Sequence, residues 1–249
     1  MALSHDAAHR FVSLAAQKIS QRQPFRVALA GGSTPALLYS LLAASPFYEE
    51  VEDWSLVHLF FGDERCVPAD APDSNYRMAH DAFYPAKGGP TRLFLPHSEG
   101  GILHRMMADL PDREEAALQY EQTLREQFRL EAGTLPRFDL ILLGMGPDGH
   151  CASLFPHKPA LQEEERLVVV TEPGLKPFVP RLTFTLPVLN HAAHVLFLVA
   201  GEDKAETLAR VLTGPRNPEV LPSQSVLPTE GTVTWLVDRE AASRLSPVR

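Results

Sequence analysis

The sequence predicts an α/β fold in a single domain over residues 1–249, with a Rossmann-like, largely parallel sheet covered by helices on both faces. Two observations lead to this prediction. Short apolar runs alternate along the chain with longer segments in which apolar residues recur at helical spacing. Glycine-containing turns follow three of the apolar runs. Strands that alternate with helices are typical of parallel sheets, because each crossover helix covers one face.

The first elements set the pattern of strand, glycine turn and helix. Residues 6–19 carry apolar side chains at helical spacing, and Ser4 is available upstream as a cap, so we expect an amphipathic helix there. Residues 26–30 form an apolar run that stops at two glycines. A second helical pattern then runs from residue 33 to about residue 44.

The same order of elements returns in the middle of the chain. Residues 56–61 are predicted as a strand, followed by a polar loop at 62–65 and by a helix that opens near Ser74. Residues 114–129 are predicted as a long helix with a solvent-facing side. Residues 138–143 form the next strand, before a further glycine turn.

Three later strands are predicted at 167–170, 194–200 and 232–237, with a helix at 203–212 behind the second of them. The four prolines between residues 214 and 228 indicate an ordered surface loop rather than a linker. The sequence contains no convincing domain boundary or internal repeat.

Composition and charge narrow the class of protein. Cys66 and Cys151 are too few for a disulfide framework and lack the spacing of a zinc site, which predicts a cytoplasmic location. The N-terminus does not resemble a signal peptide, and no run of about 18 apolar residues predicts a membrane span. The net charge of -8 opposes binding to nucleic acid, so an anionic ligand must meet a local cluster of positive groups.

The first glycine turn is a candidate phosphate site. Gly31, Gly32, Ser33 and Thr34 join flexible backbone and two hydroxyls to a helix start, whose free N–H groups and dipole attract anions. A capped helix with Pro35 in its first turn explains all of these residues except the paired glycines. No lysine follows as a nucleotide P-loop requires, so ATP is not implied.

Residues 144–149, Gly-Met-Gly-Pro-Asp-Gly, match the G-x-G-x-x-G dinucleotide fingerprint after a predicted strand. We interpret the match as accidental. The fingerprint needs a helix of several turns after its third glycine, and Pro156 and Pro159 interrupt the segment soon after that position. No dinucleotide cofactor is therefore expected.

His150 is the best candidate for a general base. It directly follows the glycine turn, where its side chain would be exposed at the sheet edge, and the reference pKa of imidazole, about 6.5, suits removal of a proton from water. Asp148 could orient the ring or bond only its own backbone. Cys151 is a weaker candidate nucleophile, since adjacency in sequence does not place a base beside a sulfur. His191 and His194 could share a helix face, but further ligands are lacking, so no metal is expected.

Three cations could contact an anionic ligand: Arg65, Arg181 and Lys204. Each could equally be a solvated charge, and Arg65 could form a loop ion pair with Asp63 or the neighbouring glutamate. Only convergence in space would favour a functional role. The carboxyl ends of parallel strands share one edge of a sheet, and the polar loops that follow the strands are expected to meet there.

Taken in order, several short motifs resemble the 6-phosphogluconolactonase family. They are Ala-Gly-Gly-Ser-Thr-Pro at 30–35, Gly-Asp-Glu-Arg at 62–65 with 73–76, the glycine turn with its histidine at 144–150, Pro-Arg-Leu-Thr at 180–183, and 201–205. Each motif is modest, but their order is distinctive, and the similarity covers nearly the whole chain. The resemblance implies the α/β fold shared with glucosamine-6-phosphate deaminases, lactone hydrolysis in the oxidative pentose phosphate pathway, and no metal or organic cofactor.

The resemblance also implies roles for the candidate residues. His150, with Asp148 beside it, would activate water against the lactone carbonyl without a covalent intermediate. Residues 31–34, Arg181 and Lys204 would hold the phosphate, and Asp63 would contact the substrate. Arg65 could bind the phosphate or the developing oxyanion. The expected partner is a small sugar-phosphate lactone, bound by a monomer or weak homodimer.

Two alternatives stay open at this point. An aminosugar-phosphate deaminase shares the first glycine motif and the Asp-Gly-His element, but resembles the form Ile-Ala-Phe-Asn-Glu-Pro after the histidine. Residues 151–156 are instead Cys-Ala-Ser-Leu-Phe-Pro, and the missing glutamate disfavours deamination. Cys151 stands where the lactonase family often has threonine. A sugar-phosphate sensor would use the same loops for binding without turnover.

Overall fold

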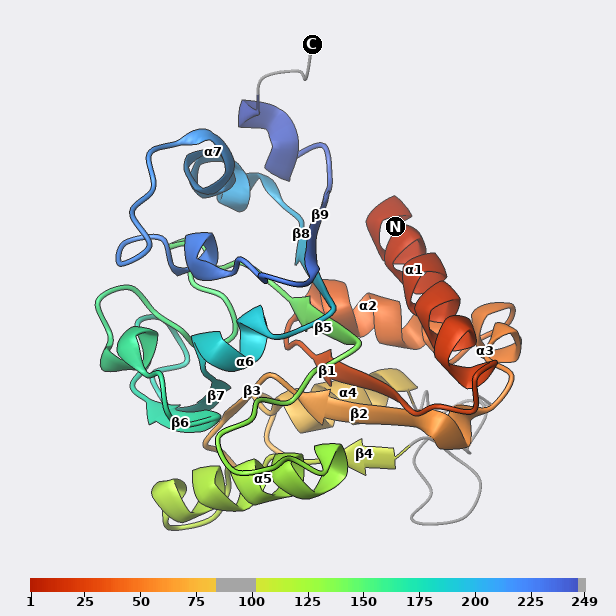
Figure 1. The fold of residues 1–249 in the computed structure, drawn as a ribbon. Coiled ribbons are helices and arrows are strands. Elements are labelled where there is room, and N and C mark those ends of the chain that lie inside the picture. Colours follow the sequence, from red (N-terminus) through yellow and green to blue (C-terminus); the bar gives the residue numbers. More distant parts are fainter. Residues whose placement is uncertain (84–101, 246–249) are drawn as a thin grey trace.

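The computed structural model describes residues 1–83 and 102–245, and its centre is a six-stranded parallel sheet of order β4-β2-β1-β5-β8-β9 (Figure 1). Its strands are β1 (Phe25–Leu29), β2 (Val57–Phe61), β4 (Ile102–His104), β5 (Leu140–Leu143), β8 (His194–Val199) and β9 (Thr232–Val237). All neighbouring pairs are parallel. The predicted α/β class is confirmed.

Helices cover both faces of this sheet (Figure 1). They are α1 (Ala2–Ile19), α2 (Ser33–Leu42), α3 (Phe47–Glu50), α4 (Asn75–Phe83), α5 (Arg113–Phe128), α6 (Leu186–Asn190) and α7 (Ala205–Thr213). Short 3₁₀ turns are η1 (Trp54–Leu56), η2 (Pro159–Gln162), η3 (Glu202–Lys204), η4 (Pro222–Ser225) and η5 (Ala241–Arg244). Helix α2 packs between α1 and α4. In the part of the chain that is described, no helix combines the length and apolarity needed to cross a membrane.

The predicted cap at Ser4 is wrong. Helix α1 already begins at Ala2, and Ser4 lies inside it, buried to 2% exposure. The apolar stripe extends upstream of the expected start, because Leu3 is also buried on the same face. Burial of this additional turn outweighs the local capping preference of a serine.

A second, antiparallel sheet was not expected from the sequence. It contains β3 (Asp63–Arg65), β7 (Arg181–Phe184) and β6 (Val168–Thr171), in the order β3-β7-β6. Residues 63–65, predicted as part of a loop, are therefore a strand, and the strand predicted at 167–170 belongs to this small sheet. The charged tripeptide forms a strand only because β7 supplies its hydrogen-bond partners.

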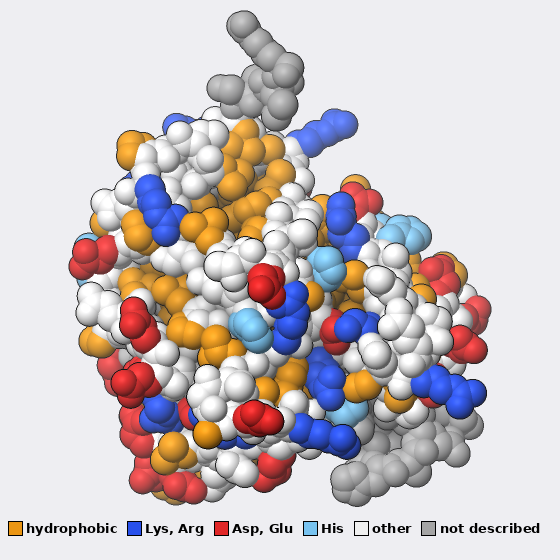
Figure 2. Space-filling model, viewed as in Figure 1, with side chains coloured by type: hydrophobic (Ala, Val, Ile, Leu, Met, Phe, Trp, Pro, Cys, Tyr) orange, Lys and Arg blue, Asp and Glu red, His pale blue; other side chains and the backbone are white. Residues whose placement is uncertain are grey.

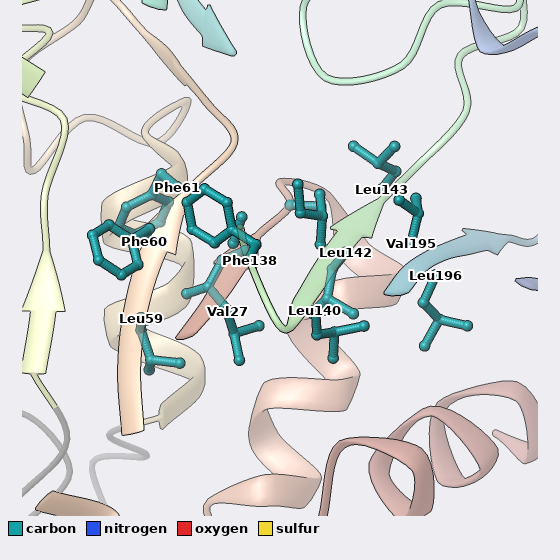
Figure 3. Close-up of a cluster of buried hydrophobic side chains, with 14 of the residues drawn as sticks. Val27, Leu59, Phe60, Phe61, Phe138, Leu140, Leu142, Leu143, Val195 and Leu196 are labelled. Carbon is teal, nitrogen blue, oxygen red and sulfur yellow. The ribbon is translucent and has the colours of Figure 1, made fainter. Parts of the chain in front are cut away.

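The core lies between the central strands and the helices (Figure 3). Ten of its side chains are labelled in Figure 3, all of them buried: Val27, Leu59, Phe60, Phe61, Phe138, Leu140, Leu142, Leu143, Val195 and Leu196. Strand β5 is buried at every position. Continuous apolar runs of this kind are typical of strands covered on both faces, which explains why they could be recognised in the sequence.

The proline-rich segment 214–228 is ordered, but it is not simply a surface loop. Its centre, η4, buries Ser223 and Gln224. The Gln224 side chain accepts a hydrogen bond from the Asn217 amide and donates to carbonyls of Arg210 and Val211, at the end of α7. The segment therefore packs against the end of α7, which a count of its prolines could not reveal.

A histidine pair at the β2/β4 edge gives a first testable prediction. The His104 ring stacks on Phe60 with centroids 4.2 Å apart, and its Nε2 lies 3.2 Å from Nδ1 of His58. Burial, together with the charges of His58 and Arg26, lowers the pKa of His104 to about 4. In the unfolded chain His104 binds a proton near pH 6.5, whereas in the folded protein it stays neutral until about pH 4. Its contribution to the free energy of unfolding is therefore fully present above pH 6.5 and is lost as the pH falls towards 4.

We therefore expect His104→Phe to flatten the acid limb of the stability curve. Between pH 6.5 and 4.5 the wild-type protein should lose on the order of 2 kcal/mol more of its free energy of unfolding than the variant. Urea unfolding at a series of pH values measures this difference. Parallel curves for the two proteins would contradict the assignment.

Candidate functional site

A cavity of about 620 Å³ opens at the carboxyl-terminal ends of the central strands. The segments that follow β1, β2 and β5 all contribute to its wall, as the expected convergence of loops requires. Its lining residues include two glycines, Gly31 and Gly32, and the polar or charged residues Asp63, Arg65, His150, Ser153, Lys176, Arg181 and Lys204. Figure 2 shows one face of the molecule, on which acidic side chains gather over α5. The cavity, by contrast, concentrates cations in an acidic protein.

The glycine turn after β5 presents His150 to the cavity. The Gly146 amide donates to the His150 carbonyl at 2.9 Å, and the Gly149 amide donates back to the Gly146 carbonyl at 3.0 Å. Gly149 has φ +83°, a left-handed conformation that favours glycine. This closed turn fixes where the His150 side chain leaves the backbone.

Asp148 orients the His150 ring. His150 Nδ1 lies 2.6 Å from Asp148 Oδ1, and the same oxygen accepts the His150 backbone amide at 3.2 Å. A carboxylate can only accept, so Nδ1 carries the proton and Nε2 is left to accept another. Burial acts to raise the pKa of Asp148, but the hydrogen bond and charge of His150 lower it overall. The pair thus has the arrangement of a base and its orienting carboxylate.

The structure argues against Cys151 as a nucleophile and gives no support to a dinucleotide site. Residues 151–158 contain no helix, so the fingerprint at 144–149 lacks the helix on which a pyrophosphate would rest. Cys151 is buried, and burial raises the pKa of its thiol to about 12, which removes the thiolate.

The two histidines considered as metal ligands have other neighbours. His191 Nδ1 lies near the Pro136 carbonyl, and His194 Nδ1 lies near the Thr232 hydroxyl. Across residues 1–83 and 102–245, no group of three or more potential ligands is arranged to hold a metal.

Arg65 and Arg181 lie side by side on neighbouring strands of the small sheet. The antiparallel register of β3 and β7 places them directly opposite. Arg65 Nη1 donates to the Asp73 carbonyl at 2.7 Å, and Arg181 Nη2 donates to the Pro177 carbonyl at 2.9 Å. Arg181 is buried, and burial together with the charge of Arg65 lowers its pKa. Like charges in directly opposed positions destabilise a sheet, so this pair is suited to an anion bound between them.

The N-cap of α2 and Lys204 lie on the same cavity. Gly32 is the N-cap of α2 with φ +105°, and no side chain caps this end, which leaves its N–H groups open to an anion. Gly31 and Gly32 line the cavity, but Ser33 and Thr34 are not among its lining residues. Lys204, at the end of η3, lines the cavity and pairs with Asp203 at 2.9 Å.

Asp63 is held by Ser153 and Asn75, two residues for which the sequence predicts no role. Its Oδ2 accepts from the Ser153 hydroxyl at 2.6 Å, and its backbone carbonyl accepts from Asn75 Nδ2 at 2.9 Å. Asn75 also packs on the first glycine turn, where a Cβ on Gly31 would lie 2.1 Å from its Oδ1. This close approach requires a glycine at position 31. Asn75 therefore ties the loop after β1 to the loop after β2.

Two further functional candidates are not predicted by the sequence. Lys176 and the exposed Phe178, in the segment between β6 and β7, also line the cavity. No sequence signal marked them, because their position follows from the small antiparallel sheet. Ser153 and Asn75 did lie in or beside recognised motifs, but their partners were separated from them by many residues.

Comparison with known proteins identifies close relatives over nearly the whole chain. The family described as glucosamine-6-phosphate isomerases/6-phosphogluconolactonase matches residues 1–235. A 6-phosphogluconolactonase of Synechocystis sp. is 42% identical over 92% of this chain and 88% of its own length. A relative with the same description from Nostoc sp. is 40% identical over 92% and 88% of the respective lengths. The solved 6-phosphogluconolactonase from Trypanosoma cruzi superposes with a TM-score of 0.81 at 31% identity, covering 98% of this chain and 93% of that one.

Proposed function

The chain belongs to the glucosamine-6-phosphate isomerase and 6-phosphogluconolactonase family, and we infer that it hydrolyses 6-phosphogluconolactone to 6-phosphogluconate with His150 as general base. The observation that carries the role of His150 is its hydrogen bond to Asp148, which leaves Nε2 as a proton acceptor in the cavity. The free thiols of Cys66 and Cys151 fit action in the reducing cytoplasm.

The reaction follows from this geometry as a general-base hydrolysis. His150 Nε2 removes a proton from water as the water oxygen attacks the lactone carbonyl carbon. The carbonyl oxygen becomes an oxyanion in a tetrahedral intermediate. When the intermediate collapses, the bond to the ring oxygen breaks and the imidazolium returns its proton to that oxygen. Asp148 stabilises the imidazolium while it exists.

The cations of the cavity supply the binding energy for the phosphate. Arg65 and Arg181 offer guanidinium donors from opposed strands, and Lys204 and the open N-terminus of α2 add positive potential. We assign Arg65 to the phosphate rather than to the oxyanion, because its placement opposite Arg181 favours a shared, doubly charged ligand. Asp63, fixed by Ser153, is suited to accept a hydrogen bond from a sugar hydroxyl.

The cavity favours hydrolysis over deamination. Among the described residues that line the cavity, Asp63 alone carries a carboxylate. The segment after His150 contributes Ser153 and Phe155 to the cavity wall instead of a further acid. Ring opening and proton shuttling on an aminosugar would need another acid or base group. Water activation needs only His150 with Asp148.

Two assays run side by side test this function. The purified protein should accelerate acid release from freshly generated 6-phosphogluconolactone above its spontaneous rate, with no ammonia released from glucosamine 6-phosphate. Ammonia release would identify a deaminase. Binding of 6-phosphogluconate without any acceleration of lactone hydrolysis would identify a sensor and overturn the proposal.

A further inference from the structure

Two hydroxyl groups from distant segments hold the backbone of the catalytic turn from behind. Thr207 Oγ1, in the first turn of α7, donates to the Pro147 carbonyl at 2.6 Å. Ser223, in η4, donates to the Gly149 carbonyl twice, from Oγ at 2.8 Å and from its backbone amide at 2.9 Å. The two carbonyls flank Asp148, the residue that orients His150.

The surroundings leave this backbone little freedom. Thr207 is 7% exposed and Ser223 is 2% exposed, so water does not readily replace either hydroxyl. Leu221 packs so closely on Gly149 that a Cβ there would lie 2.8 Å from its side chain. Neither Thr207 nor Ser223 lines the cavity, so neither contacts a bound ligand.

We propose that Thr207 and Ser223 are positioning residues that set the Asp148–His150 pair for catalysis by fixing the Pro147–Asp148 and Gly149–His150 peptide groups. The proposal rests on the role of His150 as general base. It also connects α7 both to phosphate binding and to positioning of the base, because Lys204 directly precedes this helix and Thr207 lies in its first turn. One rigid element thereby sets the spacing between the phosphate contact and the base.

Removal of single hydroxyls tests the proposal. Thr207→Val keeps the shape of the side chain but loses the donor, Thr207→Ser keeps the donor, and Ser223→Ala removes the second one. Thr213→Val is the matched control, because Thr213 lies on the same helix and its hydroxyl bonds only to the Ala209 carbonyl, within that helix. The measurements are kcat and KM of the lactonase, the proton NMR signal of His150 Nδ1–H, and the melting temperature.

We expect Thr207→Val and Ser223→Ala to lower kcat about tenfold with KM changed less than about twofold, because the base is misplaced while the phosphate contacts remain. The Nδ1–H signal should shift or broaden in both variants. Thr207→Ser and the Thr213 control should match the wild-type protein in kcat and in this signal.

Several outcomes would overturn the proposal. Folded Thr207→Val and Ser223→Ala proteins with wild-type kcat and an unchanged Nδ1–H signal would show that the hydroxyls do not position the pair. A Thr207→Ser protein as slow as Thr207→Val would assign the effect to packing. The NMR signal reports the Asp148–His150 geometry independently of turnover. Failure of the base assignment itself would give a different result, namely a His150→Ala protein that remains active.

Discussion

Replacement of His150 by alanine is expected to lower kcat by about 10² to 10⁴, the range that general-base assistance contributes. The variant should bind 6-phosphogluconate as tightly as the wild-type protein, because Arg65, Arg181 and Lys204 lie on other segments of the cavity wall. Initial rates of acid release, corrected for spontaneous lactone opening, measure kcat. Calorimetric titration with 6-phosphogluconate measures the affinity that should be kept.

Lys204→Ala provides the contrasting variant. Lys204 lines the same cavity but is assigned to the phosphate, so its loss should raise KM and leave kcat nearly unchanged. Together, the two variants separate activation of water, which changes kcat, from anchoring of the phosphate, which changes KM. A His150→Ala protein that retains wild-type kcat would remove His150 as the base, and an unchanged KM in Lys204→Ala would exclude its phosphate role.

The parts of the site that follow buried parallel strands could be predicted from the sequence. Continuous apolar runs mark β1, β2 and β5, and the residues after them must emerge at one edge of the sheet. That rule alone brings Gly31, Arg65 and His150 towards one another. The chemical preference of imidazole for proton transfer near neutral pH then distinguishes His150 from its neighbours.

The contacts that complete the site depend on pairings between distant segments. Asp63 and Arg65 lie in a strand only because β7 pairs with it, and this pairing sets Arg65 opposite Arg181. The bond from Ser153 to Asp63 joins residues 90 positions apart in the chain. Neither contact has a local pattern, so composition and periodicity cannot reveal it. The buried turn at η4, hidden in a proline-rich segment, is a further example.

Gly146→Ala should strongly reduce activity, although residue 146 supplies neither the base nor a side-chain contact to the phosphate. A Cβ on residue 146 would lie 2.1 Å from His150 Nδ1, 2.2 Å from its Cε1 and 2.7 Å from Asp148 Oδ1. The added methyl group can fit only if the imidazole moves away from its carboxylate. Since displacement of about 1 Å can cost about 10² in rate, we expect kcat to fall by at least that factor.

Gly144→Ala is the matched control within the same turn, because a Cβ at residue 144 would meet no atom within 4 Å. It should keep the Nδ1–H signal of the His150–Asp148 bond, whereas Gly146→Ala should lose it. Both proteins should melt near the wild-type temperature, since the clash at residue 146 is relieved by one partly exposed side chain. If Gly146→Ala retained kcat, the orientation of His150 by Asp148 would not be what activates the water. A fully active Gly146→Ala protein would thus contradict the proposed mechanism even if His150→Ala were inactive.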